Sequence, residues 1–246
     1  GYSSAASDVY KRQELERAYA QVKNNGQVNM ALCCDFLSRR LSRYTDVEQR
    51  YTFAERYAEL LRYHDAAWIN LWSATSAYYH ALQGETDKLP EVFSQHRLST
   101  VNMLAPGKPM MEMIENQVYL AQGAYARVVG RSAELLAVCE AMHYALVALH
   151  LRIQTAAAYG KLGKIEEART WLEKALSDAA PDGLVMPFVE NYDYIKPLLA
   201  QETQSPLAAQ IMALGEAAKV RNTASARPAV FDALTTREYE IVELMG

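Results

Sequence analysis

The sequence has few of the features that mark secreted or membrane-spanning proteins. It holds three cysteines, Cys33, Cys34 and Cys139, an odd number without a spacing pattern. We therefore expect free thiols in a reducing compartment, with no disulfide framework. No apolar run reaches the roughly 18 residues of a membrane-spanning helix, and no signal peptide pattern opens the chain. These absences favour a cytoplasmic protein without a membrane partner.

An excess of one charge is also missing. The 25 Lys and Arg residues against 29 Asp and Glu residues give a net charge of −4. This balance argues against a broad basic surface for nucleic acid on the chain as a whole. Half of the residues are hydrophobic, so the chain can bury a core. The opening "GYSSAASDVYKRQ" has no helical period, and we interpret residues 1–12 as a cloning scar or disordered segment.

Alternating strand patterns with hairpin turns are absent, which argues against a β-sheet. Helical patterns rich in Ala, Leu, Glu, Gln and Met fill the chain instead. We therefore expect an all-α fold. The expected helices cover 13–24, 28–42, 46–62, 66–83, 88–103, 110–122, 126–141, 144–161, 165–179, 191–200, 207–220 and 236–245.

Glycines punctuate these helices at a regular interval. Gly84, Gly123 and Gly163 each follow a long helical pattern and stand 39 and 40 residues apart. Glycine at such a position can take the left-handed conformation that ends a helix. A period near 40 residues is typical of stacked helical hairpins. We therefore expect a superhelix of stacked antiparallel hairpins over residues 13–200.

The clearest hairpin covers 149–181, "LHLRIQTAAAYGKLGKIEEARTWLEKALSDAAP". Small residues at Ala156, Ala168 and Ala175 would let two helices approach closely, with Leu172 between them. This segment resembles a tetratricopeptide repeat, and the resemblance implies a helical domain with a long concave face. Such a face suits a peptide, a partner domain or a small molecule.

The character of the chain changes after residue 200. A short helical pattern leads into the small and polar stretch 221–233, so residues 201–233 are predicted to be a helix and an interdomain linker. Thr235 and Glu238 then have the spacing of a capping box, flanked by Leu234 and Tyr239 at the positions of a hydrophobic staple. We expect one isolated helix to begin here, too short to be stable alone.

This last segment, "LTTREYEIVELMG", resembles the first helix of a LuxR-type helix-turn-helix domain. That helix usually opens Leu-Thr-x-Arg-Glu-x-Glu, followed by apolar residues. The matching positions are Leu234, Thr235, Arg237, Glu238, Glu240, Ile241, Val242, Leu244 and Met245. Thr236 stands where the pattern more often has Pro. The resemblance implies that residues 234–246 begin a DNA-binding domain that is truncated in this sequence.

A second resemblance covers 171–191, "WLEKALSDAAPDGLVMPFVEN", which is similar to the end of the sensor region in MalT-like LuxR regulators. The order of repeat, "APDG", "PFVEN", linker and "LTTRE" is the order of that family. The resemblance implies a bacterial transcription regulator, in which an inducer or protein partner on the helical superhelix controls DNA binding. It further implies DNA contact only through the missing part of the helix-turn-helix domain, and a homo-oligomer of the full-length protein.

Two alternatives remain open. A free-standing repeat protein that serves as a protein–protein interaction adaptor fits the same helical pattern. A helical metalloenzyme would use Glu140, His143 and His150, but four facing ligands or a third zinc ligand are not recognisable. The chain has no P-loop motif and no catalytic triad pattern. We expect no enzyme activity and no cofactor or metal in this chain.

Candidate ligand-binding residues come from the unusual number of tyrosines, 16 in all. Tyr79, Tyr119, Tyr125 and Tyr159 lie on or beside predicted inner helices, where aromatic rings could line a ligand or partner groove. Tyrosines of this kind also pack in cores with a hydrogen-bonded hydroxyl. The sequence does not decide between these two roles.

Overall fold

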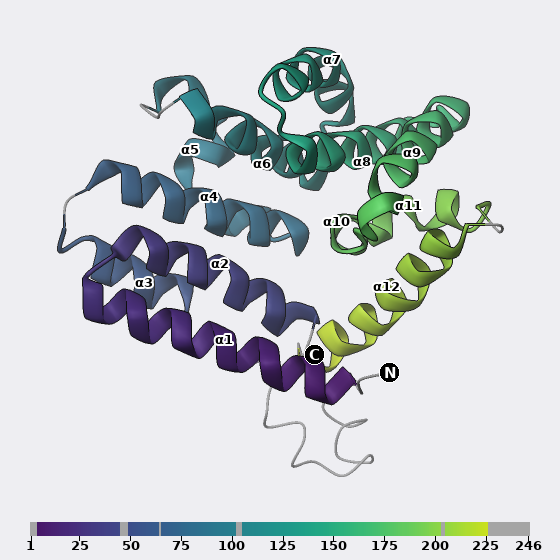
Figure 1. Cartoon of the computed structure of the whole chain (residues 1–246). Coiled ribbons are helices and arrows are strands. Elements are labelled where there is room, and N and C mark those ends of the chain that lie inside the picture. Colours follow the sequence, from purple (N-terminus) through teal and green to yellow (C-terminus); the bar gives the residue numbers. More distant parts are fainter. Residues whose placement is uncertain (1–3, 45–48, 64, 102–104, 203–204, 226–246) are drawn as a thin grey trace, which may run out of the picture.

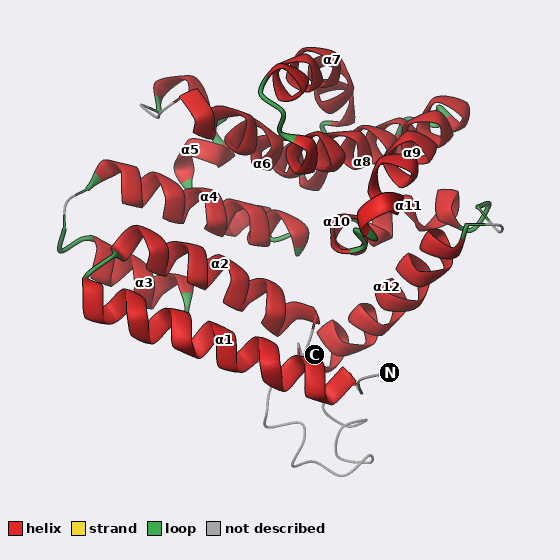
Figure 2. Cartoon of the chain, in the orientation of Figure 1, coloured by secondary structure: helices red, strands yellow, loops and turns green. Residues whose placement is uncertain are grey.

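The computed structural model of the chain describes residues 4–44, 49–63, 65–101, 105–202 and 205–225, which form helices and no β-strand (Figures 1 and 2). The predicted all-α class is therefore confirmed. The α-helices are α1 (Ser4–Asn25), α2 (Val28–Tyr44), α3 (Phe53–Leu60), α4 (Ala66–Leu82), α5 (Glu91–Ser94), α6 (Lys108–Ala121), α7 (Tyr125–Ala141), α8 (Ala145–Lys161), α9 (Ile165–Ala179), α10 (Met186–Glu190), α11 (Tyr192–Leu199) and α12 (Pro206–Ser225). Short 3₁₀ turns cover Thr86–Lys88, Leu98–Thr100, Ala105–Gly107 and Ala180–Asp182.

The helices α2, α4, α6 and α8 form an inner row, because each contacts the next along the chain. Helices α1, α3, α5, α7 and α9 flank this row and pair with members of it (Figure 1). The most extensive pairing joins α8 and α9, the hairpin singled out from the sequence. Its Ala156, Ala168, Leu172 and Ala175 are fully buried, as their small or apolar side chains predict.

The turns between helices use left-handed residues at the predicted places. Gly84, Gly123 and Gly163 have φ of 72°, 74° and 75°, which confirms their role in ending α4, α6 and α8. The corresponding turn between α7 and α8 has no glycine, and there His143 takes φ of 56°. A side chain in this conformation is uncommon. The regular turn geometry therefore continues through a position that the glycine pattern misses.

Two predicted helices are wrong in extent. The helix expected over 46–62 begins only at Phe53, because Thr52 and Glu55 form a capping box that starts α3. The helix expected over 88–103 is broken into the four-residue α5 and a 3₁₀ turn. Pro90 lies just before α5, and His96 takes a left-handed φ of 54°, which a helix cannot continue through.

The two ends of the fold also differ from the expected boundaries. Helix α1 begins at Ser4, so the backbone of residues 4–12 continues a helix where no structure was expected. Helix α12 extends to Ser225, five residues into the stretch interpreted as a linker. Helix α10 was not predicted at all. Its five residues are too few for a helical period to be recognised in the sequence.

The C-terminal helices close the inner row into a ring. Helices α10 and α11 pack on α8, the last inner helix, while α12 packs on both of them and on α2, the first inner helix. Figure 1 shows α10 inside the curve of the array and α12 crossing from α11 toward the end of α2. The largest core lies among these elements and includes the fully buried Ile153, Phe188, Ile195 and Ile211.

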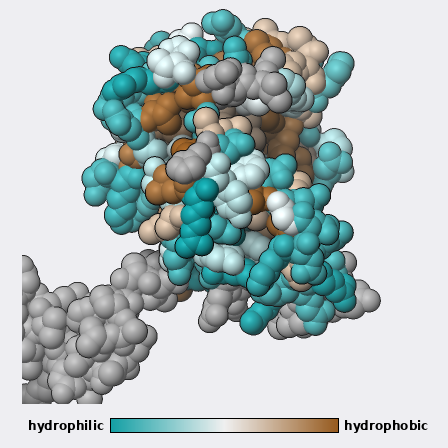
Figure 3. All heavy atoms as spheres, turned by 90° about the vertical axis from the view of Figure 1, so that its left-hand side faces the viewer, coloured by the Kyte–Doolittle hydropathy of each residue, from teal (hydrophilic) through white to brown (hydrophobic). Residues whose placement is uncertain are grey.

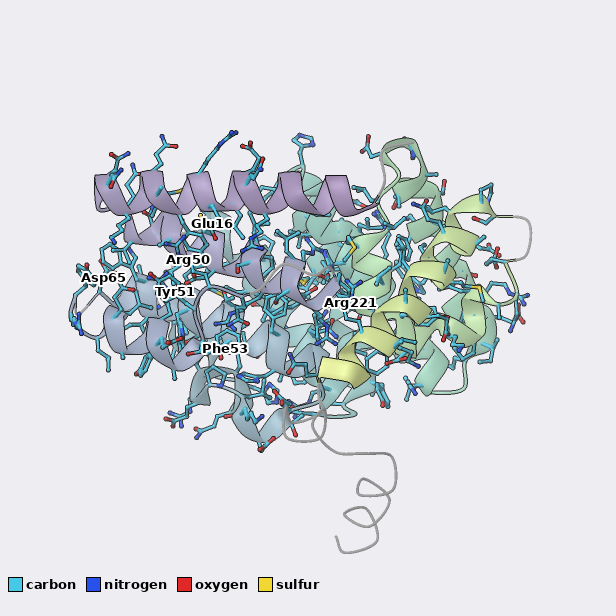
Figure 4. All side chains as sticks on the ribbon, turned by 90° about the horizontal axis from the view of Figure 1, so that it is seen from below. Glu16, Arg50, Tyr51, Phe53, Asp65 and Arg221 are labelled. Atoms are coloured by element: carbon cyan, nitrogen blue, oxygen red, sulfur yellow. The ribbon has the colours of Figure 1, made fainter. Side chains whose placement is uncertain are left out.

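A polar network supports the N-terminal hairpins. Asp35 of α2 accepts hydrogen bonds from Tyr19 of α1 (2.6 Å) and from Arg56 of α3 (2.5 Å to Nε). At the edge of this network Arg50 pairs with Glu16 at 2.8 Å, in the region that Figure 4 labels. Three separate helices are joined through one buried carboxylate.

The exposed surface carries apolar residues in separate groups. On the face that Figure 3 shows, hydrophobic side chains lie among hydrophilic ones and do not form one continuous area. Within the described residues, no helix combines the length and the apolar character that crossing a membrane requires.

Candidate functional site

A buried carboxylate lies where the C-terminal helices meet the inner row. Helix α10 carries Pro187 in its first turn, a position that proline tolerates well. Phe188 and Val189 follow and are buried in the main core. The next residue, Glu190, has a side chain with 0% exposure. A buried carboxylate is costly unless it is paired and hydrogen-bonded.

Glu190 finds both of its partners far away in the sequence. The Arg40 Nε of α2 donates to Glu190 Oε1 at 2.7 Å, and the Tyr78 hydroxyl of α4 donates to Oε2 at 2.7 Å. Bonds to a charged acceptor are stronger than those between neutral groups. The carboxylate thus connects α10 to the first two helices of the inner row.

The neighbours of this ion pair are held neutral. His150 of α8 is buried and meets the Tyr78 ring edge-on at 6.3 Å between ring centres. Burial lowers the pKa of His150 to about 4, while burial and the nearby Glu190 raise the pKa of Tyr78 well above its ordinary value. We call Glu190, Arg40, Tyr78 and His150 the carboxylate centre.

A pocket of about 230 Å³ adjoins this centre. Four segments contribute to its walls: the end of α2, the end of α4, the α10–α11 junction and α12. The lining residues are Arg43, Tyr44, Ala81, Leu82, Gln83, Gly84, Val189, Glu190, Tyr192, Asp193, Tyr194, Gly215, Ala218 and Lys219. We call it the seam pocket, because it lies between the hairpin array and the helix that closes the ring.

Helix α12 is anchored in the main core by Ala208 and Ile211, and beside this pocket it also makes polar contacts near the surface. Glu216 accepts a hydrogen bond from the Tyr192 hydroxyl at 2.7 Å and pairs with Lys196 at 2.5 Å. Lys219 pairs with Asp193. Exposed ion pairs of this kind contribute little to stability. These contacts of α12 beside the pocket are therefore weaker than the buried contacts of the carboxylate centre.

A second pocket of about 530 Å³ lies beside α6 and α7. In it the His96 ring stacks on Tyr119 with 4.2 Å between ring centres. Arg131 pairs with Glu115 at 2.7 Å and also with Glu112. The acidic groups of this pocket are thus satisfied by its own arginine. The seam pocket is the stronger candidate, because distant parts of the chain form it together.

The structure places the four tyrosines singled out from the sequence in different surroundings. Tyr79 is buried and donates to the Phe36 carbonyl at 3.0 Å, and Tyr119 lines the second pocket. Tyr125 and Tyr159 are partly buried against the main core. The tyrosines that line the seam pocket are instead Tyr44, Tyr192 and Tyr194. A ligand role for the original four stays a prediction.

The residues that resemble the start of a helix-turn-helix domain, Leu234, Thr235, Arg237 and Glu238, lie outside the described part of the chain. Within the described part, no group of three or more His, Cys, Asp or Glu side chains is placed to hold a metal ion. Glu140 pairs with Arg152 at 3.4 Å, and His143 lies exposed in its turn.

Sequence reasoning missed the carboxylate centre. One local signal was available: Glu190 is an acidic residue directly after the apolar run of "LVMPFVE", where the flanking residues are expected to be buried. That pattern suggests a buried acid without naming its partners.

Comparisons of this chain with protein-family models, with curated proteins and with solved structures each find no match.

Proposed function

We propose that this chain is the sensor and coupling region of a LuxR-type transcription regulator with a MalT-like helical sensor. The observation that carries the proposal is the seam pocket, whose walls come from the hairpin array and from α12 together. Helix α12 is also the element that leads to residues 226–246. A ligand in the seam pocket therefore touches the segment that connects the array to the proposed DNA-binding domain.

The coupling between ligand and α12 follows from a difference in contacts across the seam pocket, between the wall formed by the inner row and the wall formed by α12. The inner row is fixed by the carboxylate centre, whereas the part of α12 beside the pocket, beyond its buried Ala208 and Ile211, is held by Tyr192 and by exposed ion pairs. A ligand shifts the position of α12 only if it binds one arrangement more tightly than the other. Its contacts to Gly215, Ala218 and Lys219 provide such a difference, because these residues move with α12.

A ligand screen with a blocked pocket tests the sensing role. Ala218 lines the pocket, so Ala218→Phe fills it, while Ala217→Phe adds the same side chain on the exposed side of α12. A ligand of the seam pocket should raise the melting temperature of the wild type and of Ala217→Phe, since binding to the native state stabilises it. It should leave Ala218→Phe unchanged and alter hydrogen exchange in α12. Ligands that shift both variants equally would argue against this site.

The reading frame beyond Gly246 tests the regulator class separately. The proposal expects the frame to continue into a turn and a second, recognition helix, because base readout requires that helix in the major groove. The alternative, a free-standing adaptor, expects a stop codon or an unrelated segment there. A frame without a recognition helix would remove the regulator and leave the adaptor.

A further inference from the structure

The two acidic side chains of the seam pocket are paired within the protein, Glu190 with Arg40 and Asp193 with Lys219, so a further cation must exchange with one of these partners or use the aromatic rings and the helix end. Both of its basic side chains have partners: Arg43 Nη2 donates to the Leu82 carbonyl at 3.3 Å, and Lys219 pairs with Asp193. In addition, α4 ends at Leu82 in the pocket wall, with Gln83 as its C-cap. The C-terminal end of a helix carries a partial negative charge, which favours a cation within its last turn.

The aromatic rings of the pocket already attract cations of the protein. The Arg43 guanidinium lies 5.8 Å from the centre of the Tyr44 ring. Lys219 Nζ lies 5.9 Å from the centre of the Tyr192 ring, and Lys161 Nζ lies 5.6 Å from that of Tyr194. Ammonium and guanidinium groups at such distances are attracted to the ring faces. The three tyrosines are therefore chemically suited to an ammonium group.

We propose that the ligand of the seam pocket is a small organic ammonium compound, and that Lys219 of α12 is its competitor within the chain. The proposal rests on the sensor function proposed above and names the chemical class of its ligand. In the structure, Lys219 provides the ammonium group between Asp193 and the Tyr192 ring. An external ammonium that takes this place removes one of the contacts that hold α12.

The size of the pocket and the strength of the competing contact fit this exchange. A volume of about 230 Å³ is below the roughly 300–1,000 Å³ of pockets for drug-sized ligands, so the ligand has few heavy atoms. The Lys219 and Asp193 side chains are 45% and 66% exposed. An ion pair with this exposure is weak. A ligand present at millimolar concentration can therefore compete with it.

Titration by nuclear magnetic resonance tests the proposal on the full chain. The probes are n-butylammonium chloride, sodium butyrate as the anion of similar size, and sodium chloride at the same ionic strength. We expect butylammonium to shift the amide signals of residues 190–194 and 215–219, with little effect from the other two salts. Butyrate binding at the pocket in preference to butylammonium would overturn the ammonium class.

Two substitutions test the competition. Lys219→Met removes the competing ammonium, so butylammonium should bind roughly two- to fivefold more tightly than to the wild type, as expected for a surface ion pair. Asp193→Asn removes the counter-charge and should weaken binding. The matched control, Lys174→Met, changes an exposed lysine of α9 and should leave binding unchanged. Equal affinities in Lys219→Met and Lys174→Met would disprove the role of Lys219.

The outcomes separate this inference from the sensor function. A neutral or anionic ligand that binds the seam pocket and alters hydrogen exchange in α12 would disprove the ammonium class of ligand and support the proposed sensor function. Ammonium binding that is tighter in Lys219→Met, without any change in α12 exchange, would support the ligand class and remove the coupling role.

Discussion

Gly215 of α12 lies directly on the ring of Tyr192 from α11, so closely that a Cβ atom at position 215 would be 2.4 Å from Tyr192 Cγ. A glycine therefore permits the approach of α12 to the C-terminal core at this point. The same tyrosine holds Glu216 through its hydroxyl. One aromatic ring thus positions α12 by shape and by a hydrogen bond.

Gly215→Ala should weaken the docking of α12. The added methyl group meets the ring itself and not the end of a flexible side chain, so either α12 or Tyr192 must shift. Overpacking of this kind costs about 1–3 kcal/mol. Hydrogen exchange should become faster in α12 and remain slow in α6 and α8. The control is Gly130→Ala in α7, where a Cβ meets nothing within 4 Å. Gly215→Ala should lower the free energy of unfolding and Gly130→Ala should raise it, because alanine favours a helix by up to about 1 kcal/mol over glycine.

Arg40→Met should destabilise the fold through the carboxylate centre. In this variant Glu190 loses its cationic partner and keeps only the hydrogen bond from the Tyr78 hydroxyl. Breaking a buried ion pair in this way costs about 3–5 kcal/mol. Chemical denaturation of the wild type and the variant measures the difference. Arg17→Met removes an ion pair whose arginine is 73% exposed, and should cost at most about 1 kcal/mol. The double variant Arg40→Met with Glu190→Leu should recover part of the loss. Equal stability of Arg40→Met and Arg17→Met would contradict this account.

The features that sequence analysis predicted correctly are local ones. The turns at Gly84, Gly123 and Gly163 depend on the conformation of one residue type, and the α8–α9 hairpin depends on small residues at helical spacing. The start of α3 shows that a local signal can also be overlooked. Thr52 and Glu55 have the same spacing as Thr235 and Glu238, yet a single helix was expected to run through them.

The candidate site could not be predicted in the same way. Glu190 lies 150 residues from Arg40 and 112 from Tyr78, and no period or motif links positions so far apart. The seam pocket exists only because α12 returns to α2, a contact that depends on the curvature of the whole array. Sequence patterns indicate which faces are buried, but they do not indicate which distant faces meet.

Leu172→Ala should show how much the α8–α9 hairpin contributes to stability. Leu172 is 0% exposed between two helices, and its truncation leaves a cavity. Such changes cost about 2–5 kcal/mol. Leu146→Ala is the matched control, because Leu146 of α8 is 51% exposed. Thermal unfolding should show a large loss for the first variant and a small one for the second. Similar melting temperatures would mean that the core tolerates this cavity by collapse.

The buried His150 should make the fold sensitive to acid. Its pKa falls from 6.5 in the unfolded chain to about 4 in the fold, because burial disfavours the charged ring. Between these two values the unfolded chain binds more protons than the folded chain. The free energy of unfolding should therefore keep its full value above pH 6.5 and decline as the pH falls toward 4. The shift corresponds to about 3 kcal/mol as an order of magnitude.

His150→Leu isolates this contribution, because leucine fills a similar volume and carries no proton. The variant loses the hydrogen-bonding capacity of the ring, but the Nδ1 atom of His150 makes no hydrogen bond in the structure. The difference in unfolding free energy between the two proteins should stay constant above about pH 6.5 and change as the pH falls toward 4, because the stability of the variant falls less steeply. Acidic groups elsewhere titrate in both proteins and cancel in the difference. Parallel curves over this range would mean that His150 becomes protonated without leaving its buried position.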